Sequence, residues 1–145
     1  MAKVSTYLNF PRETEEAFNF YKSVFGGDFL GEINRFKDMP DADKLLKENQ
    51  NKVMHIALPI GKGNVLMATD ALESMGHKLI PGNNFYLSLE AENKPEAEKL
   101  FNALSKGGTV TMPLADAFWG AYFGMLTDKF GINWMVNYTY PQQSN

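Results

Sequence analysis

The sequence predicts an α+β fold made of two βαβββ modules, whose curved mixed sheets pair around a cleft. Three observations support this prediction. A strand, helix and Gly-Gly pattern occurs twice, about 80 residues apart, and a hairpin-like pair of strands follows in each half. The chain of 145 residues is 44% hydrophobic, which suits a single domain with a sizeable core. Because one four-stranded unit would leave an apolar sheet face exposed, the two units are expected to pack together.

The first module is expected within residues 1–70. A strand-like run at residues 7–10 is followed by apolar residues at spacings of three and four, which is typical of one helix face. Gly26 and Gly27 end this helix. Strand patterns follow at residues 28–36, 53–60 and 64–69, and the last two flank a short Gly-Lys-Gly turn. Residues 38–50 are interpreted as an insertion, a loop or short helix, that the second half lacks.

Residues 71–82, rich in Gly, Pro and polar side chains, are expected to be a linker, and residues 83–140 a second module. This module repeats the order of the first, with a strand at 86–89, a helix ended by Gly107 and Gly108, and strands at 109–114, 121–127 and 132–138. Tyr7 corresponds to Tyr86, Tyr21 to Phe101 and Gly26 to Gly107. An ordered set of matches at one offset indicates an internal duplication.

The composition argues against several classes of protein. The chain has no cysteine, so disulfides and thiolate metal sites are excluded. Fourteen basic residues against seventeen acidic ones, with no basic stripe, argue against nucleic-acid binding. No apolar run approaches the roughly 20 residues needed to span a membrane. Met1 leads directly into a strand-like pattern without a signal peptide, so a cytoplasmic location is expected.

Six motifs, spread in order over nearly the whole chain, carry a resemblance to a known family. They are YLNF at 7–10, EAFNFY at 16–21 followed by FGG, VMH at 53–55, LMATD at 66–70, FWG at 118–120 and DKFGINWM at 128–135. Together they resemble the vicinal-oxygen-chelate superfamily, which includes glyoxalase I, extradiol dioxygenases and bleomycin-resistance proteins, and in particular its PhnB-like branch. Members of that branch are often labelled as a demethylubiquinone methyltransferase. Methyl transfer is disfavoured here, because the Gly-Gly pairs follow helices and do not form the glycine-rich loop of a nucleotide-binding sheet.

The resemblance implies a divalent metal held by four His, Glu or Gln side chains. Matching helices and turns places these positions at Thr6, Ala68, Asn84 and Met135. None of the four offers an imidazole or a carboxylate, the ligands that a catalytic first-row metal requires. The sequence therefore predicts no metal and no other cofactor. A metal bound in a shifted arrangement that includes His55 is the alternative.

His55 is the candidate catalytic residue, because it lies in an otherwise apolar strand. It is either a hydrogen-bonded structural histidine or a pocket residue that contacts a ligand or acts as a general base, with metal ligation as a third possibility. Arg35 is a candidate anchor for a carboxylate or phosphonate, or else an outward-facing charge on an edge strand. Asp70 is expected to cap a helix or turn, and His77 to lie in a solvated loop.

Aromatic residues complete the candidate site. Trp119, beside Gly120, is expected at a cavity rim, whereas Trp134 either faces the cavity or packs in the core. Glu32 and Glu90 are candidates to assist His55 and Asp70 at the site. The full set of expected ligand-binding residues is Tyr7, Asn9, Arg35, Met67, Asn84, Trp119, Phe123, Trp134 and Met135.

The sequence leaves three hypotheses for function. The first is a small-molecule binding protein of the glyoxalase/bleomycin-resistance fold without the family metal. The second is a metal-dependent lyase, isomerase or dioxygenase-like enzyme that uses a shifted site with His55, so the question of catalysis stays open. The third is a dimerisation module with a filled cavity. The resemblance also implies a homodimer.

Overall fold

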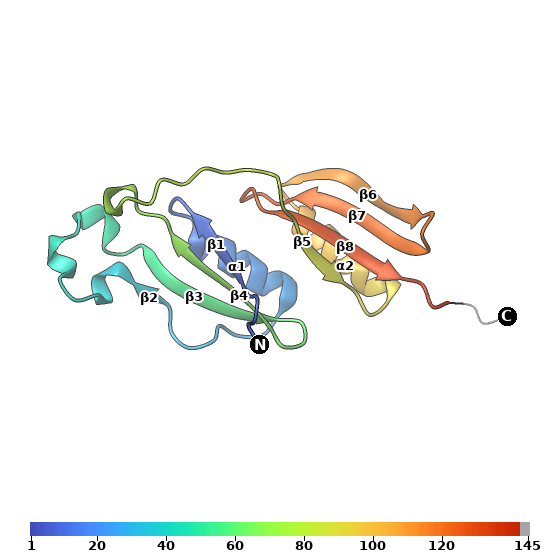
Figure 1. Ribbon diagram of the computed structural model, residues 1–145, viewed down its shortest axis with the longest axis horizontal. Coiled ribbons are helices and arrows are strands. Elements are labelled where there is room, and N and C mark those ends of the chain that lie inside the picture. The colour runs from blue at the N-terminus through green and yellow to red at the C-terminus, as the bar shows by residue number, and fades with distance from the viewer. Residues whose placement is uncertain (143–145) are drawn as a thin grey trace. The chain divides into compact units, whose positions relative to one another are not determined.

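The structure, a computed structural model, describes residues 1–142. The chain divides into two compact units, Met1–Ile80 and Pro81–Asn145 (Figure 1), and the division falls inside residues 71–82. Each unit is one βαβββ module with a four-stranded mixed sheet, so the predicted α+β class and doubled module are confirmed. The pairing of the two sheets around a cleft within a single domain stays a prediction.

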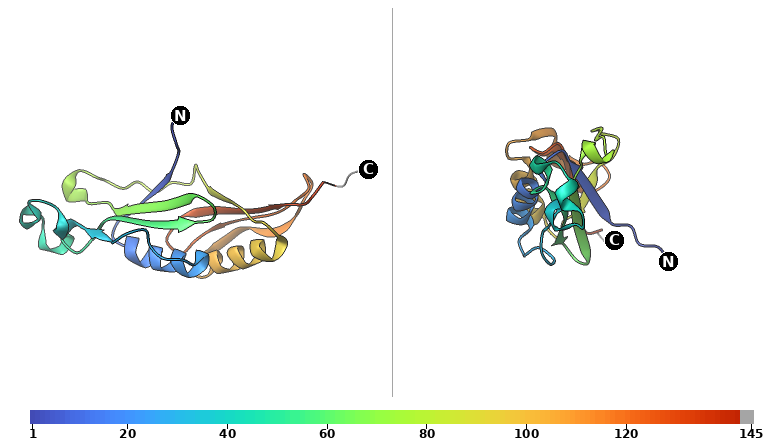
Figure 2. Two further views of the ribbon diagram at one scale, coloured as in Figure 1. Left: turned by 90° about the horizontal axis from the view of Figure 1, so that it is seen from below. Right: turned by 90° about the vertical axis from the view of Figure 1, so that its left-hand side faces the viewer.

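The first unit contains β1 (Thr6–Phe10), α1 (Thr14–Phe25), β2 (Asn34–Arg35), β3 (Val53–Ile60) and β4 (Asn64–Asp70). The strand order is β1-β4-β3-β2, with β1 and β4 parallel and the other neighbours antiparallel. Helix α1 covers one face of this sheet (Figure 2). Alternate strand residues, among them Leu8, Phe10, Ile56, Leu58, Leu66 and Ala68, are buried on that side.

The second unit repeats this arrangement with β5 (Leu87–Glu90), α2 (Lys94–Ser105), β6 (Thr109–Ala117), β7 (Ala121–Thr127) and β8 (Asn133–Thr139). The strand order is β5-β8-β7-β6, and again only the first pair is parallel. Residues on the α2 side of the sheet, including Leu126, Trp134 and Val136, are fully buried. Neither helix in the described part of the chain is long and apolar enough to cross a membrane.

The expected strand at residues 28–36 is wrong for most of its length. Only Asn34 and Arg35 pair with β3. Gly31 has a φ of 72°, a left-handed conformation that interrupts an extended ladder, and Leu30 makes a single backbone bond to Ala57 before it. The insertion after β2 consists of three short 3₁₀ helices, η1 (Phe36–Asp38), η2 (Ala42–Lys44) and η3 (Lys47–Asn49), and a fourth, η4 (Glu73–Met75), follows β4.

Candidate functional site

The face of the first sheet that α1 does not cover carries a group of mostly polar side chains, with one imidazole and one phenol. We call it the first-module face and define it by Tyr7, Asn9, His55, Met67 and Thr69. Tyr7 and Asn9 alternate with the buried residues of β1, and their register partners on β4 are Met67 and Thr69. His55 comes from β3. Tyr7 is 44% exposed and the other four are half-buried, so these side chains line a surface and do not fill the core.

Tyr7 and His55 are joined by a hydrogen bond on this face. The Tyr7 hydroxyl lies 3.1 Å from Nδ1 of His55, and the two ring centroids are 5.7 Å apart. Strand β4 separates β1 from β3, so the pair reaches across a whole strand. Burial raises the pKa of the Tyr7 phenol, which keeps it protonated at neutral pH. The first module therefore holds an imidazole in a fixed orientation at a half-exposed surface.

The structure thus brings together four of the residues predicted from the sequence, Tyr7, Asn9, His55 and Met67. Their contact with a ligand stays a prediction. Asn84, by contrast, lies exposed in the segment that precedes β5, outside any strand.

A corresponding face exists on the second sheet, away from α2. Phe123 and Met135, both predicted as ligand-binding residues, are half-buried there. Trp119 lies at the turn between β6 and β7, is 55% exposed, and meets Phe123 edge to face with centroids 5.5 Å apart. Phe118 also meets Trp119 edge to face, with centroids 5.1 Å apart, and is 99% exposed. The expected position of Trp119 at a cavity rim stays a prediction.

Glu90 is an acid near this second face that accepts three hydrogen bonds. Its Oε2 accepts a bond from Nδ2 of Asn137 at 2.6 Å, and its Oε1 accepts bonds from the backbone N–H and hydroxyl of Thr139 at 3.1 and 2.9 Å. Burial raises the pKa of the Glu90 carboxyl, but these bonds together outweigh it and hold the pKa below its usual value. From the sequence, Glu90 was only a candidate to assist other site residues. Its hydrogen-bond partners on β8 could not be predicted, because they depend on the register between β5 and β8.

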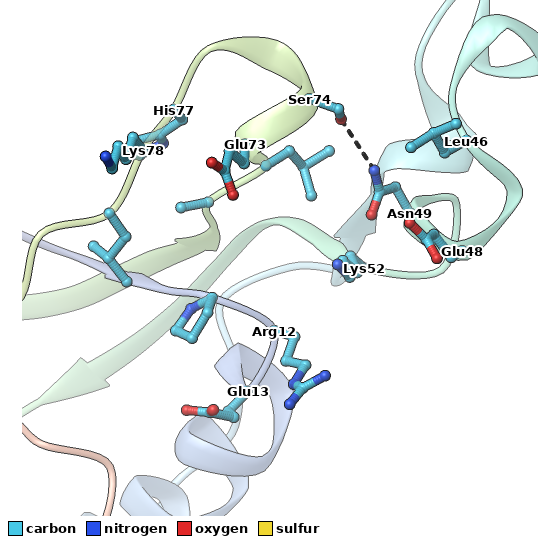
Figure 3. A pocket seen from close by; sticks show the side chains of 14 residues that line it. Arg12, Glu13, Leu46, Glu48, Asn49, Lys52, Glu73, Ser74, His77 and Lys78 are labelled. Atoms are coloured by element: carbon cyan, nitrogen blue, oxygen red, sulfur yellow. Dashed lines mark hydrogen bonds between the residues drawn. The ribbon is translucent and has the colours of Figure 1, made fainter.

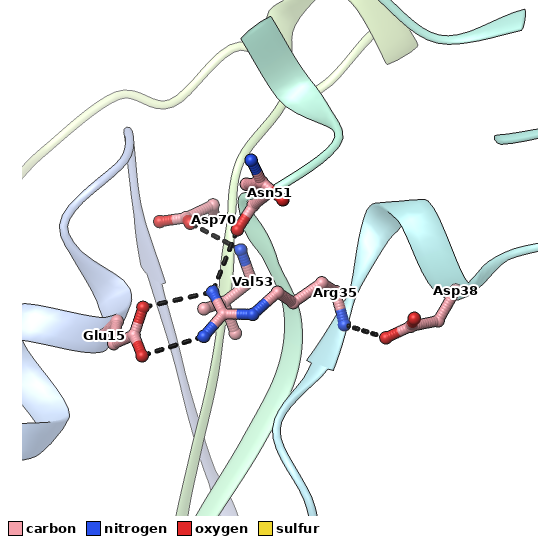
Figure 4. Close-up of polar contacts among 6 residues, drawn as sticks. All are labelled: Glu15, Arg35, Asp38, Asn51, Val53 and Asp70. Carbon is pink, nitrogen blue, oxygen red and sulfur yellow. Dashed lines mark hydrogen bonds and ion pairs between the residues drawn. The ribbon is translucent and has the colours of Figure 1, made fainter. Parts of the chain in front are cut away.

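The Arg35 guanidinium is hydrogen-bonded within the first module (Figure 4), and its role as an anchor for a carboxylate or phosphonate stays a prediction. The guanidinium donates two parallel hydrogen bonds to the Glu15 carboxylate on α1, at 3.0 and 2.8 Å, and a third to the backbone oxygen of Asn51 at 2.9 Å. The bidentate bond lowers the pKa of Glu15. Arg35 therefore ties β2 to the helix, on the side opposite the first-module face.

Trp134 is a core residue of the second module. Its side chain is fully buried, and its indole N–H donates to Oδ2 of Asp128 at 2.9 Å. The sequence alone allowed Trp134 to face either the core or a cavity. The register of β8 places Trp134 in the core, because its neighbour Met135 is the residue that faces away from α2.

Asp70 confirms the expected capping role. It is 3% exposed, and its two oxygens accept bonds from the backbone N–H groups of Thr14 and Val53 at 3.1 and 2.8 Å. Thr14 is the first residue of α1 and Val53 the first of β3, so one carboxylate joins three elements. Figure 4 shows its bond to Val53.

The four positions matched to the family metal, Thr6, Ala68, Asn84 and Met135, offer no imidazole or carboxylate. Ala68 is fully buried on the α1 side of the sheet, so its match to a ligand position is wrong. Of the four, Met135 is the residue that lies in a strand, β8, and faces away from the helix of its module. Within residues 1–142, no three His, Asp or Glu side chains gather closely enough to hold a metal ion. The residues present do not fit a first-row divalent cation, which prefers imidazole and carboxylate donors.

A groove of about 710 Å³ lies at one end of the first module, where the β1–α1 turn, the insertion and the segment after β4 meet (Figure 3). Asn49, 5% exposed, holds the insertion there by donating to the hydroxyl of Ser74 at 3.1 Å. His77 lines this groove, together with three basic and three acidic residues: Arg12, Lys52, Lys78, Glu13, Glu48 and Glu73. This balance of charge gives the groove no preference for either sign of ligand.

The doubled βαβββ module and its two mixed sheets define a glyoxalase-like fold. The family model described as 3-demethylubiquinone-9 3-methyltransferase matches residues 2–137. The chain belongs to this family.

Similar proteins agree with this assignment. The protein YjdN of Escherichia coli K12 is 30% identical over 142 residues, which cover 92% of this chain and 93% of YjdN. The crystal structure of PA1353 from Pseudomonas aeruginosa is 37% identical, with a TM-score of 0.83 over 96% of this chain and 98% of that one. A PhnB protein from Bacillus cereus is 27% identical, with a TM-score of 0.74 over 95% of this chain and all of the other.

Proposed function

We propose that the protein binds a small organic molecule on the first-module face without a metal ion. The observation that carries this proposal is the Tyr7–His55 hydrogen bond. It holds a polar imidazole in a fixed orientation at a half-exposed surface, beside Asn9 and Met67. Small-molecule sites combine apolar lining with a few fixed polar groups of this kind.

The methyltransferase in the family's description is not the activity that this fold supports. Cofactor sites of the nucleotide-binding type lie at a parallel sheet, after a glycine-rich loop that opens a helix. In the described residues each sheet has one parallel pair, and Gly26 and Gly27 end α1. A metal-dependent lyase, isomerase or dioxygenase-like enzyme remains the competing proposal, and it requires His55 to be a metal ligand.

A ligand screen combined with metal analysis tests the proposal. A ligand that binds only the folded protein raises its unfolding midpoint, so a metabolite library can be screened by thermal shift. For a hit, His55→Ala is expected to weaken affinity about tenfold and Tyr7→Phe by a smaller factor, as expected for loss of one hydrogen bond and its geometry. His77→Ala, which removes the other histidine from a separate groove, is the matched control and should leave affinity unchanged.

Two results would overturn the proposal. One is stoichiometric Zn, Ni, Mn or Fe in the purified protein that disappears in His55→Ala, which would establish the competing enzyme. The other is a ligand whose affinity is the same in wild type, Tyr7→Phe and His55→Ala.

A homodimer is part of the proposal, on the resemblance to the family. Light scattering on the purified protein should then give twice the chain mass of 16.3 kDa. A mass of one chain across the micromolar range would contradict it.

A further inference from the structure

We propose that the second module carries a binding site for a small organic ammonium ion, formed by tyrosine rings and carboxylates on the α2 side of its sheet. The site shares no residue with the first-module face and goes beyond the proposed function. We call it the tyrosine cluster. Its members are Tyr122, Tyr138, Tyr140, Lys94, Glu98 and Asp116.

Strand register brings the members from the sheet together. Tyr122 on β7 is paired with Tyr138 on β8 and with Asp116 on β6, so these three side chains lie on one face of the sheet. Tyr138 follows the buried residues Trp134 and Val136 at alternate positions of β8, which fixes that face as the α2 side. Three neighbouring strands therefore contribute to one patch beside α2.

Tyr138 and Tyr140 form two walls of this patch. Their ring centroids are 5.4 Å apart and their planes meet at 76°, so the rings stand nearly perpendicular to each other. The backbone N–H of Tyr140 donates to the backbone oxygen of Gly120 at 3.0 Å, which holds Tyr140 beside the β6–β7 turn. The rings of Tyr122, Tyr138 and Tyr140 are half-buried, so each keeps a part open to solvent. The negative face of such a ring attracts a cation.

Two carboxylates hold the rings and supply the charge. The Tyr122 hydroxyl donates to Oε1 of Glu98 on α2 at 3.2 Å, and the Tyr140 hydroxyl donates to Oδ1 of Asp116. Each bond fixes the position of a ring and places a carboxylate at its edge. The cluster contains two acidic residues and one basic residue, so its formal charge at pH 7 is negative. This combination of rings and charge suits a cation and disfavours an anion.

Lys94 shows that an ammonium group fits against these rings. It is the first residue of α2, and its Nζ lies 4.6 Å from the centroid of the Tyr122 ring, within the range of a cation–π interaction. The Lys94 side chain is exposed, so a ligand can take its place at the ring. A lysine ammonium is strongly hydrated, whereas an alkylated ammonium contacts aromatic rings through its methyl groups. The ligand class is therefore an alkylated ammonium that exchanges with Lys94.

Binding is tested with choline and with 3,3-dimethylbutan-1-ol, the uncharged isostere of choline, at an ionic strength balanced with sodium chloride. The tyrosine ring signals are followed by ¹H–¹³C NMR, and single Phe substitutions assign the six tyrosines of the chain. Choline should give saturable shifts at the three rings of the cluster and none at Tyr21, which is fully buried in the first module. The isostere should give none at any of these rings.

Variants test the exchange with Lys94 and the part played by the rings. Lys94→Met removes the internal ammonium and keeps a side chain of similar length, so choline should bind about twofold to fivefold more tightly. Lys99→Met removes another exposed lysine of α2 and is the matched control for net charge, with a much smaller effect expected. Tyr138→Leu should weaken binding about twofold to fivefold, as expected for one exposed cation–π contact. Amide spectra verify that each variant is folded.

Three results would overturn the proposal. Equal shifts from choline and its isostere would show that the rings recognise apolar volume and not charge. Equal effects of Lys94→Met and Lys99→Met would show a general attraction of cations to the surface, without exchange at the Tyr122 ring. A Lys94→Met protein whose cluster signals do not respond to choline would remove the site itself. The proposed function is independent of these outcomes, because its test uses variants of Tyr7 and His55.

Discussion

The carboxylate of Asp70 accepts a hydrogen bond from the backbone N–H of Thr14, 56 positions earlier in the chain. Its second oxygen accepts the N–H of Val53, and the site is buried. Asp70→Ala is expected to lower the free energy of unfolding by about 3 kcal/mol, because two buried donors lose their acceptor. Urea unfolding measures this loss. Asp43→Ala, an exposed acid in the insertion, is the control and should change stability by less than about 0.5 kcal/mol.

Glu15 and Arg35 form an ion pair that should give the first module an acid-sensitive contribution. The pKa of Glu15 is lowered, chiefly by its hydrogen bonds with Arg35. A lowered folded-state pKa means that the stabilisation is present above the unfolded value of about 4.3 and is lost as the pH falls through the folded value. The pair is partly exposed, so we expect only about 0.5 kcal/mol at pH 7.

Measurement of stability against pH for wild type and Glu15→Gln tests this expectation. The two curves should differ at pH 7 and converge below pH 4. Curves that stay parallel down to pH 2 would contradict the assignment.

Trp134 and Asp128 should act as a structural pair in the second module. Asp128 also accepts backbone bonds from Phe130 and Ile132 through its Oδ1, so the indole N–H completes a buried cluster. Trp134→Phe is expected to lower the free energy of unfolding by about 3 kcal/mol, from the lost hydrogen bond and the smaller ring. Trp119→Phe, at an exposed turn, is the comparison and should cost less than about 1 kcal/mol. Equal losses for the two would argue against the buried cluster.

Gly124 in β7 lies against the side chain of Phe101 from α2. A Cβ atom there would lie 2.7 Å from the Phe101 side chain and 3.0 Å from two backbone atoms of β6. Gly124→Ala should therefore destabilise the protein by about 1–3 kcal/mol through overpacking. Gly82→Ala is the control, since its Cβ would meet only Asn84 at 3.8 Å. Chemical denaturation of both variants gives the comparison, and a neutral Gly124→Ala would show that the helix can shift at no cost.

Tyr140 donates its phenolic hydrogen to Asp116, and this bond is the main cause that raises the pKa of Tyr140 to about 12. Because the folded value exceeds the unfolded value of about 10, the stabilisation is present below pH 10 and is lost as the pH rises through 12. Asp116→Asn should move the Tyr140 pKa toward 10. Tyrosine ring NMR signals followed between pH 9 and 13 report it, and an unchanged pKa would contradict the role of Asp116.

Much of the fold could be predicted from local pattern. Residues 53–60 and 121–127 are strands with the predicted bounds, and both helices end at the predicted Gly-Gly pairs or one residue from them. The strand predicted at residues 28–36 was mostly wrong. The sequence pattern does not reveal whether a strand has a partner or where a glycine turns the chain. Local periodicity therefore predicts element type well and pairing less well.

The candidate site was less predictable because it depends on side-chain direction. Tyr7 and His55 could each be selected from sequence, but their contact across β4 follows from the register of three strands. A one-residue choice of register decides that Trp134 is buried while Met135 faces away from α2. The irregularity between Asn34 and Arg35 similarly redirects Arg35 to Glu15.

The two helices begin in different ways, and this has a consequence for folding kinetics. Helix α2 is capped locally, since Oδ1 of Asn93 accepts the N–H of Glu96 three residues on. Helix α1 has no side-chain cap from its own N-cap residue and depends on Asp70, which arrives only when β4 is in place. Bringing Asp70 to Thr14 closes the long stretch of chain between them, and this closure carries an entropic cost that a local cap avoids. We therefore expect α2 to nucleate early, and the start of α1 to consolidate late, with low φ-values at Thr14 and Asp70.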